Sequence, residues 1–254
     1  MTLLAVERIK LFTTRSPLWC TLAAIAVTVG FSALVTGTAN ELTPTISTTQ
    51  FGVNFGLMVI MVMATLAITT EYRFGTIRAT FQAIPNRTST LLAKTTVVAL
   101  FAGLIGEVAA FGSVAIAKLV RSSAALGIDT AFEWRAVAGV GLVYAFAAVI
   151  AIAVGLLIRH SAGAVSILLI YTLLVESLVS LIPTVGVDIQ KWMPFNVANK
   201  FLTGDPDASN VVVAGEGPQA SNATLSPWWA LAYFAAFAVV MLGIAVFTAN
   251  RRDA

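Results

Sequence analysis

Six apolar runs, each about as long as a bilayer is thick, constrain the fold of this chain more than any other feature. A transmembrane helix needs roughly 20 consecutive, mostly apolar residues. Of the 254 residues, 58% are hydrophobic and 11% are charged, whereas a soluble domain carries about 25% charged residues. We therefore expect an all-α integral membrane protein with a single transmembrane domain over residues 1–254. The predicted spans are 17–38, 53–70, 95–117, 136–158, 162–182 and 227–249.

The positive charges between these runs predict the orientation, because Lys and Arg concentrate on the cytoplasmic side of membrane proteins. Assigning alternate loops to two sides places ten of the 15 Lys and Arg residues on the side that holds both termini. We therefore expect both termini in the cytoplasm, and we explain the net charge of +3 by topology and not by nucleic-acid binding. The ten are Arg8, Lys10, Arg15, Arg73, Arg78, Arg87, Lys94, Arg159, Arg251 and Arg252; the other five are Lys118, Arg121, Arg135, Lys191 and Lys200.

Two segments outside the spans have helical patterns of their own. In residues 1–15, polar and apolar side chains recur on different helical faces, which predicts an amphipathic helix lying on the inner membrane surface. The segment 183–226 follows the fifth predicted span and begins with mixed apolar, polar and aromatic residues. Pro194 can open a short helix there, so we expect an interfacial or re-entrant helix on the outer side before the last span.

The stretch 71–94, EYRFGTIRATFQAIPNRTSTLLAK, carries five charges between two apolar runs. An apolar stripe with helical spacing predicts an amphipathic helix over 71–84, ended by Pro85. Such a helix would present a docking edge to a cytoplasmic partner. The alternative is a solvated loop that merely obeys the charge rule. The stripe consists of Phe74, Ile77, Phe81 and Ile84.

The sequence lacks the motifs of several kinds of catalytic site. Lys94-Thr95 has no glycine-rich turn before it, so it does not form a phosphate-binding loop. The single histidine, His160, lies in a short predicted turn beside Arg159, where a structural role is expected. The single cysteine, Cys20, can form neither an internal disulfide nor a metal site. We therefore predict no enzyme activity and no metal or cofactor bound by this chain itself.

Two carboxylates fall within predicted spans. Glu107 lies near the middle of the third span, and Glu176 lies about two thirds along the fifth. A charge at the centre of a membrane helix costs roughly 2.5–3.5 kcal/mol, so such residues usually face a bundle interior or a polar cavity. Either they line a translocation route or bind a cationic group of the substrate, or they are hydrogen-bonded to a neighbouring helix or protonated and hold the bundle together.

Four motifs resemble the membrane subunits of bacterial type-2 ATP-binding-cassette (ABC) transporters, over nearly the whole chain. The most specific is the turn after the second span, where an E-[YF]-x-x-G-T-x-[RK] pattern recurs in that family. The four are Glu7-Arg8-Ile9-Lys10-Leu11 with Thr14-Arg15-Ser16; Glu71-Tyr72-Arg73-Phe74-Gly75-Thr76-Ile77-Arg78 with Pro85-Asn86-Arg87 and Ala93-Lys94; the segment 155–164, GLLIRHSAGA; and Glu176 with Trp192-Met193-Pro194-Phe195.

The resemblance implies a permease in the bacterial inner membrane, and most members of that family are exporters. In that family two membrane subunits pair with two ATPase subunits, which bind ATP and Mg. The second permease chain would be identical or a relative. The loop between spans two and three would form the coupling helix docked on the ATPase, and the substrate would be lipophilic or amphipathic, such as an antibiotic, a lipid or a peptide. The implied coupling residues are Glu71, Arg73, Phe74, Gly75, Arg78 and Phe81, and the implied translocation path comprises Glu107, Glu176, Trp192 and Phe195.

Two other functions are compatible with the same residues. An ion-coupled secondary carrier would use Glu107 and Glu176 as proton sites and would transport without ATP. A non-transporting anchor or sensor would recruit a cytoplasmic partner through residues 71–94. The three hypotheses differ in whether an ATPase binds the chain and in whether the chain alone moves a substrate.

Overall fold

The structure is a computed structural model that describes residues 2–38, 44–84, 86–122, 124, 126–207 and 220–252. Within these residues the chain is helical and contains no strand, which confirms the predicted all-α class. Six helical segments are long and apolar enough to cross a membrane, as the sequence predicted. The spans are Arg15–Thr38, Ile46–Arg73, Arg87–Val120, Ala131–Ile158, Ser161–Val179 and Pro227–Arg252.

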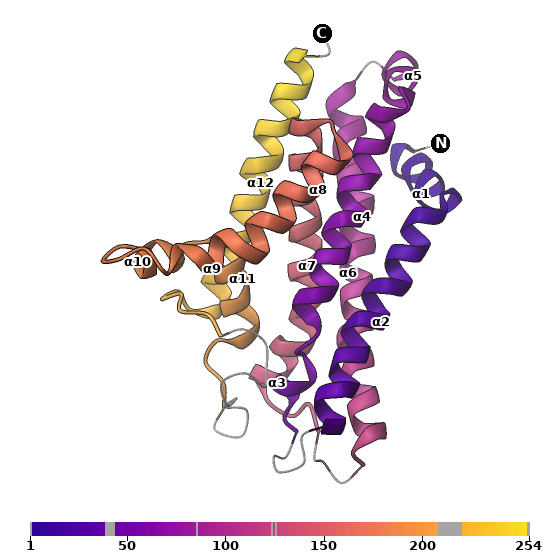
Figure 1. The fold of residues 1–254 in the computed structure, drawn as a ribbon. Helices are drawn as coiled ribbons and strands as arrows, with labels where there is room; N and C mark the ends of the chain where they lie inside the picture. Colours follow the sequence, from indigo (N-terminus) through magenta and orange to yellow (C-terminus); the bar gives the residue numbers. More distant parts are fainter. Residues whose placement is uncertain are drawn as a thin grey trace.

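The helices form one elongated bundle (Figure 1). The helices α1 and α5, the turn between α7 and α8, and the last turn of α12 lie at one end of the bundle, called here the α5 end; α3 lies at the opposite end. The elements are α1 (Leu3–Thr13), α2 (Arg15–Thr38), α3 (Ile46–Thr49), α4 (Val53–Arg73), α5 (Thr76–Ala83), α6 (Arg87–Val120), α7 (Ala131–Ile158), α8 (Ser161–Ile170), the π-helix η1 (Tyr171–Val175), α9 (Glu176–Val179), α10 (Gly186–Gln190), α11 (Pro194–Thr203) and α12 (Pro227–Arg252).

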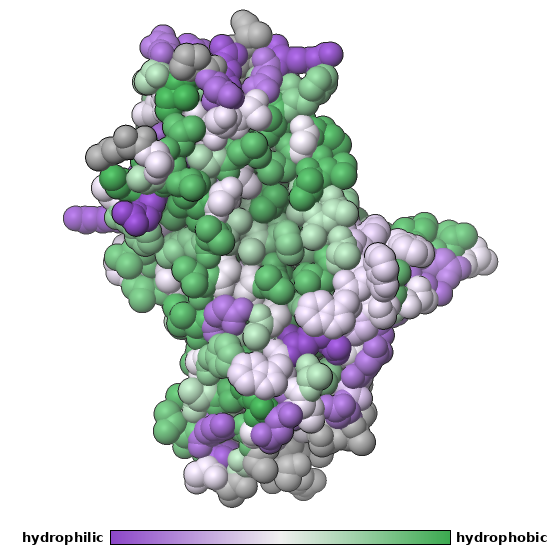
Figure 2. Space-filling model, turned by 180° about the vertical axis from the view of Figure 1, so that it is seen from behind, coloured by the Kyte–Doolittle hydropathy of each residue, from purple (hydrophilic) through white to green (hydrophobic). Residues whose placement is uncertain are grey.

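Helix α7 forms the centre of the bundle and is the most buried of the six spans. It packs against α4, α6 and α12. The fully buried Tyr144 of α7 donates its hydroxyl to the carbonyl of Val53 at 2.7 Å, which satisfies a polar group deep in the bundle. The side of the bundle opposite to the view of Figure 1 has a wide hydrophobic belt between hydrophilic regions, as expected for a surface that faces lipid (Figure 2).

Small residues let α2 and α4 approach closely. A Cβ atom at Gly52 would lie 2.4 Å from the backbone oxygen of Thr28, and one at Gly56 would lie 2.1 Å from the Thr28 hydroxyl. Neither position has room for a side chain without a shift of the neighbouring helix. Close backbone approach at glycine is a general means of packing helices in a bilayer.

Several helices extend beyond the apolar runs from which they were predicted. Helix α6 begins at Arg87 and not at residue 95, because Asn86 caps it by accepting a hydrogen bond from the Ser89 amide at 3.1 Å. Helix α7 begins at Ala131 and not at residue 136, because Thr130 and Glu133 form a capping box. Polar residues outside the lipid can continue a helix, so a prediction from hydropathy alone started these two helices five to eight residues too late.

The predicted single helix over 71–84 was wrong in its extent. Helix α4 continues to Arg73, and α5 begins only at Thr76. Gly75 adopts a left-handed conformation with φ of 70°, which breaks the helix and redirects the chain. As a result Phe74 lies outside the predicted apolar stripe and is 71% exposed, whereas Ile77 is buried. The residue expected to end this helix, Pro85, lies outside the described residues.

The fifth span is not one regular helix to residue 182. It runs through α8, the five-residue π-helix η1 and α9, and it ends at Val179, shortly before Pro183. The chain then projects away from the bundle as α10 before returning as α11 (Figure 1). Helix α11 begins at Pro194, as the sequence predicted. The second half of the segment 183–226 includes residues 208–219, which lie outside the described residues.

Candidate functional site

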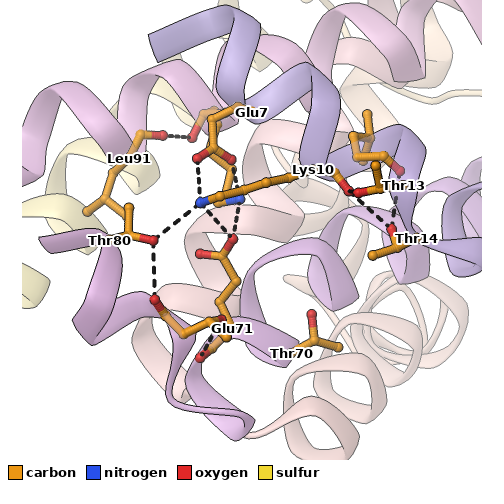
Figure 3. A network of polar contacts seen from close by, with 12 residues as sticks. Glu7, Lys10, Thr13, Thr14, Thr70, Glu71, Thr80 and Leu91 are labelled. Atoms are coloured by element: carbon orange, nitrogen blue, oxygen red, sulfur yellow. Dashed lines mark hydrogen bonds and ion pairs between the residues drawn. The ribbon is translucent and has the colours of Figure 1, made fainter. Parts of the chain in front are cut away.

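Four charged side chains from three helices meet at the α5 end of the bundle (Figure 3). We call them the ionic cluster: Glu7 and Lys10 of α1, Glu71 of α4 and Lys94 of α6. Two carboxylates and two ammonium groups give the cluster no net charge. Residues separated by up to 87 positions in sequence therefore share one ionic site.

Lys94 occupies the centre of the ionic cluster. Its ammonium donates to Glu7 in a short hydrogen bond and to Glu71 at 2.9 Å. The side chains of Lys94 and Glu7 are only 7% and 4% exposed, so this is a buried ion pair. Removing one partner of a buried pair typically costs about 3–5 kcal/mol, because the other charge is left uncompensated.

Lys10 is the more accessible member and connects the ionic cluster to α5. Its ammonium lies 3.0 Å from Glu7, 3.5 Å from Glu71 and 3.3 Å from the hydroxyl of Thr80 on α5. Partial burial alone would lower the pKa of Lys10, but the attraction of Glu71 and Glu7 outweighs it and raises that pKa above its usual value. The cluster thus joins α1, α4, α5 and α6.

The polar face of α1 therefore points into the protein. A surface helix usually turns its polar side to water. Here Glu7 and Leu11 are buried, while Leu4, Ile9 and Phe12 are 49%, 47% and 61% exposed. The predicted helix over 1–15 exists as α1. The bundle holds Glu7 and Lys10, whereas Arg8 is exposed together with the apolar Leu4, Ile9 and Phe12.

The ionic cluster forms one wall of a cavity of about 580 Å³ between α1, α4, α5 and α6. The lining also includes the apolar side chains of Leu11, Met63, Leu66 and Val98 and a further basic residue, Arg15 of α2. The four charges of the ionic cluster compensate one another through their own ion pairs.

The residues expected to contact an ATPase, which lie at the end of α4 and on α5, differ in whether they are exposed. Arg73, Phe74 and Arg78 are exposed, and the Arg73 guanidinium lies 5.5 Å from the Phe74 ring centroid. Glu71 is 14% exposed and pairs with Lys94 and Lys10 within the chain. Phe81 is partly buried against the core. Of the six predicted coupling residues, the structure thus leaves Arg73, Phe74, Gly75 and Arg78 at the surface.

The turn between α7 and α8 is two residues long, as short as the sequence indicated. Arg159 ends α7 in a left-handed conformation, with φ of 58°, and its guanidinium lies 4.9 Å from the ring centroid of Tyr72. His160 caps α8: its Nδ1 accepts a hydrogen bond from the Gly163 amide at 3.1 Å. Through this contact His160 holds the first turn of α8.

Glu176 caps a helix that begins 18 residues later. Its two carboxylate oxygens accept hydrogen bonds from the amides of Phe195 at 3.0 Å and Asn196 at 2.8 Å, in the first turn of α11. These amides have no partner within their own helix, and the helix dipole favours a negative charge there. The side chain is buried. Glu176 therefore fixes the start of α11 against the fifth span.

Amide side chains surround this contact. Asn196 donates to the Gln190 carbonyl at 2.8 Å and to the Asn222 side chain at 2.7 Å, and Asn222 donates to the Gln190 side chain at 2.8 Å. Gln190 in turn donates to the backbone carbonyl of Glu176 at 3.1 Å. Together with Glu176 these three residues form what we call the Glu176 cap, which is built from amides and contains no basic side chain.

A cavity of about 190 Å³ lies between the Glu176 cap and α4. Its lining combines amides, such as Asn54 and Asn199, with the apolar side chains of Leu57, Met58 and Met61. Glu176 and Phe195, both predicted to lie on a translocation path, line this cavity together.

The other two residues predicted for that path lie elsewhere. Trp192 is 52% exposed, and its carbonyl accepts a hydrogen bond from the Tyr233 hydroxyl at 2.9 Å. Glu107 is half-buried against Gly141 of α7, where a Cβ atom would lie 2.3 Å from its Oε1. Neither residue lines the cavity beside Glu176, so the two membrane carboxylates do not form a pair.

The partners of Glu7 and Glu176 could not be identified from the sequence. Glu7 and Lys94 were assigned to separate segments, and only their shared cytoplasmic placement hinted at a contact. Asn196 follows Pro194 by two residues, which is a helix start, but no local pattern connects it to Glu176. Among the described residues, no group of three or more His, Cys, Asp and Glu side chains could hold a metal ion.

The comparison with protein families agrees with this architecture. The model of the family described as ABC-2 family transporter protein matches residues 3–175, which include the ionic cluster, α5 and the turn between α7 and α8. Neither a curated protein nor a solved structure matches the chain. The matched segment contains the first four spans and most of the fifth, up to the last residue of η1. This chain therefore belongs to the ABC-2 transporter family, as a multi-pass membrane permease subunit.

Proposed function

We propose that this chain is the permease half of an ABC exporter driven by ATP hydrolysis on separate ATPase subunits. ATP and Mg bind to those subunits and not to this chain. The observation that supports this most directly is the position of α5: a short helix at the end of the bundle, exposed on one side and connected to the ionic cluster on the other. In this proposal α5 is the coupling helix of the family.

Helix α5 has one anchored side and one free side. Ile77 is 5% exposed and Phe81 packs against the core, whereas Arg78 is exposed, as is Arg73 at the end of α4. The left-handed Gly75 sets the direction in which α5 leaves α4. An ATPase that grips the exposed arginines can therefore move α5 as a unit without first having to unfold its apolar side.

The ionic cluster provides a route for that movement. Thr80 contacts Lys10, and the cluster connects α5 to α1, α4 and α6. A buried cluster of charges has strict geometric requirements, because each ammonium needs its carboxylates. Displacing α5 would alter this arrangement and change how α1 lies against α4 and α6, which is a direct way to alternate access across the membrane.

The cavity beside Glu176 is the proposed part of the translocation path. Its mixed amide and apolar lining fits a lipophilic or amphipathic substrate. The surface from α8 to α10 is apolar and exposed at Ile167, Leu174 and Leu181, which are 54%, 52% and 74% exposed. In this proposal a second permease chain, identical or related, packs beside that surface and completes the path.

Co-purification tests the proposal. The chain, expressed with the ATPase subunits of its host, should recover an ATPase, and Arg78→Glu should reduce that recovery by roughly tenfold or more, because it reverses a charge at the proposed contact. Gly75→Pro should have a similar effect, since proline cannot adopt the positive φ of this position.

The matched control is Lys118→Glu, the same reversal of an exposed charge near the far end of α6. It should leave ATPase recovery unchanged. Transport of substrate by the purified chain alone, in vesicles without ATP, would contradict the proposal and favour an ion-coupled carrier. Recovery of an ATPase that never supports transport would favour a membrane anchor.

A further inference from the structure

The cavity beside the ionic cluster is large enough to hold a ligand. Its volume of about 580 Å³ falls within the range of pockets that bind drug-sized molecules, about 300–1,000 Å³. Its lining comes from α1, α2, α4, α5 and α6, together with Phe74 between α4 and α5. The smaller cavity beside Glu176 lies against other residues of α4, and the two cavities share no described lining residue. The larger cavity is therefore a separate site, and what it binds does not depend on the proposed translocation path.

Apart from the ionic cluster, the buried lining of this cavity is apolar and the exposed lining is mostly polar. Leu11, Met63 and Val98 are only 7%, 1% and 2% exposed. A molecule that matches both parts has an apolar chain at one end and a polar head at the other. The exposed lining residues are Thr13, Thr14, Arg15, Ser16, Phe74 and Thr76.

Arg15 gives the exposed part of the lining a positive charge. The described lining has three basic side chains and two acidic ones, which leaves one positive charge in excess. Lys10 and Lys94 pair with Glu7 and Glu71 inside the ionic cluster. Within the part of the chain that the structure describes, no carboxylate pairs with the Arg15 side chain. An anion bound at Arg15 would therefore balance a charge that has no partner in this part of the protein.

The hydroxyl groups next to Arg15 lie apart from the carboxylates of the ionic cluster. Thr13 and Thr14 donate to the Lys10 carbonyl at 3.1 Å and 3.4 Å, so they lie beside its backbone. The Lys10 ammonium, at the other end of that side chain, points toward the carboxylates and Thr80 (Figure 3). An anionic head beside Arg15 would therefore be kept away from the carboxylates that would repel it.

We propose that this cavity binds an anionic amphiphile with a single apolar chain, such as a lysophospholipid or an alkyl phosphate. The guanidinium of Arg15 matches phosphate oxygens with paired hydrogen bonds. The chain covers Met63 and Val98 and so removes apolar surface of both molecules from water. The size of the cavity, in the range for drug-sized molecules, limits the occupant to one chain. The ligand enters from the membrane leaflet at the α5 end.

Photolabelling of the chain in phosphatidylcholine nanodiscs, without any ATPase, tests this site. The probe is hexadecyl phosphate with a photoactivatable diazirine near the end of its chain, and mass spectrometry locates the label. The label should map to the parts of α4 and α6 that contain Met63 and Val98. Unlabelled hexadecyl phosphate should compete at about fivefold lower concentration than hexadecanol, the factor expected for one exposed ion pair. Inorganic phosphate at millimolar concentration should not compete, because it lacks the chain.

Two variants separate recognition of the head from recognition of the chain. Arg15→Glu should reverse the preference, so that hexadecyltrimethylammonium competes better than hexadecyl phosphate. Ala67→Phe fills the cavity from α4 and should reduce labelling by about tenfold whatever the head group. Arg8→Glu is the matched control for the charge reversal, since Arg8 is an exposed arginine of α1 that does not line the cavity. It should leave the preference for hexadecyl phosphate unchanged.

Four outcomes would overturn the proposal. One is label spread over the exposed faces of many helices, which would mean that the probe stays in the bilayer. Another is equal competition by hexadecanol and hexadecyl phosphate, which would show that the head is not recognised. Competition by inorganic phosphate would make the site one for a free anion. An equal effect of Arg8→Glu and Arg15→Glu would show a diffuse surface attraction. Because no ATPase takes part, none of these outcomes bears on the proposed coupling through α5.

Discussion

The ionic cluster and the Glu176 cap hold buried carboxylates by opposite means. In the cluster, Glu7 is compensated by full positive charges on Lys94 and Lys10. In the cap, Glu176 is compensated by two backbone amides at the start of α11, with no basic side chain among the cap residues. The first carboxylate depends on ions from other helices, and the second depends on the dipole and the free amides of a single helix.

This difference determines how each site responds when a helix moves. A cluster of matched ions is sensitive to the position of every helix that contributes a charge, so a shift of α1, α4 or α6 unbalances it. A capped carboxylate can move together with its helix, because the bonds follow the first turn of α11. The α5 end is therefore suited to respond to a partner, and the Glu176 cap is suited to keep α11 attached to the fifth span.

The largest expected effect comes from removing the central ammonium of the cluster. Lys94→Met should lower the free energy of unfolding by about 3–5 kcal/mol, because two carboxylates then share Lys10 alone. The double variant Glu7→Gln with Lys94→Met should recover more than half of that loss, since it restores a balanced Lys10–Glu71 pair. Reversible unfolding of the detergent-purified chain measures both.

An exposed pair of the same residue types is the control for this cycle. Lys191 and Asp188 lie 2.7 Å apart, but Asp188 is 73% exposed. Lys191→Met should change stability by less than about 0.5–1 kcal/mol. An equally small effect for Lys94→Met would mean that the ionic cluster is solvated, and the contrast between the two carboxylate sites would then disappear.

A smaller effect is expected at the Glu176 cap. Glu176→Gln keeps one acceptor oxygen and removes the charge, so it should cost about 1–2 kcal/mol, the worth of a helix cap together with its dipole interaction. Transport should persist within about threefold, because the amide can still hold the start of α11. The measurement is unfolding stability together with transport in reconstituted vesicles.

Glu107→Gln, made in parallel, allows the effects of removing the two membrane carboxylates to be compared in the same assays. It should affect stability less than Glu176→Gln does, since Glu107 is only half-buried. If Glu176→Gln abolished transport while stability stayed unchanged, its charge would act on the substrate, and the structural interpretation of the cap would be wrong.

The smallest effect is expected at the accessible edge of the cluster. Folding raises the pKa of Lys10, so its contribution to stability is fully present below its usual pKa of about 10.5 and is lost as the pH rises through the higher folded value. Melting temperatures recorded between about pH 9 and 11.5 should therefore fall less steeply for Lys10→Met than for the unchanged chain. Identical pH profiles would show that Lys10 does not contribute.

Sequence reasoning was most successful where one physical signal dominates. Long apolar runs have few alternatives to a membrane helix, so the spans and the all-α class could be predicted. Helix starts that depend on local capping were also within reach: Pro194 was recognised, whereas Asn86 and the Thr130 box were not. The side of the membrane on which the α5 end lies stays a prediction from the positive charges.

The contacts between distant segments could not be predicted. The inward face of α1 depends on Lys94, which is 87 residues away from Glu7. The role of Glu176 depends on the chain returning through α10 to place α11 against it, and no local pattern in the sequence encodes that return. A buried charge signals only that a partner exists; it does not say whether the partner is an ammonium group or a helix end.

The π-helix η1 has a consequence for how such a protein can change over evolution. Its wider turn, in which the Glu176 amide bonds to the Tyr171 carbonyl five residues earlier, amounts to one residue inserted into an α-helix. Loss of that single residue would rotate everything after it by about 100° around the axis, since an α-helix has 3.6 residues per turn. Glu176 would then point away from α11. The family match ends at residue 175, the last residue of η1, so one codon deleted within η1 would redirect the remainder of the chain while the four spans before it stay the same.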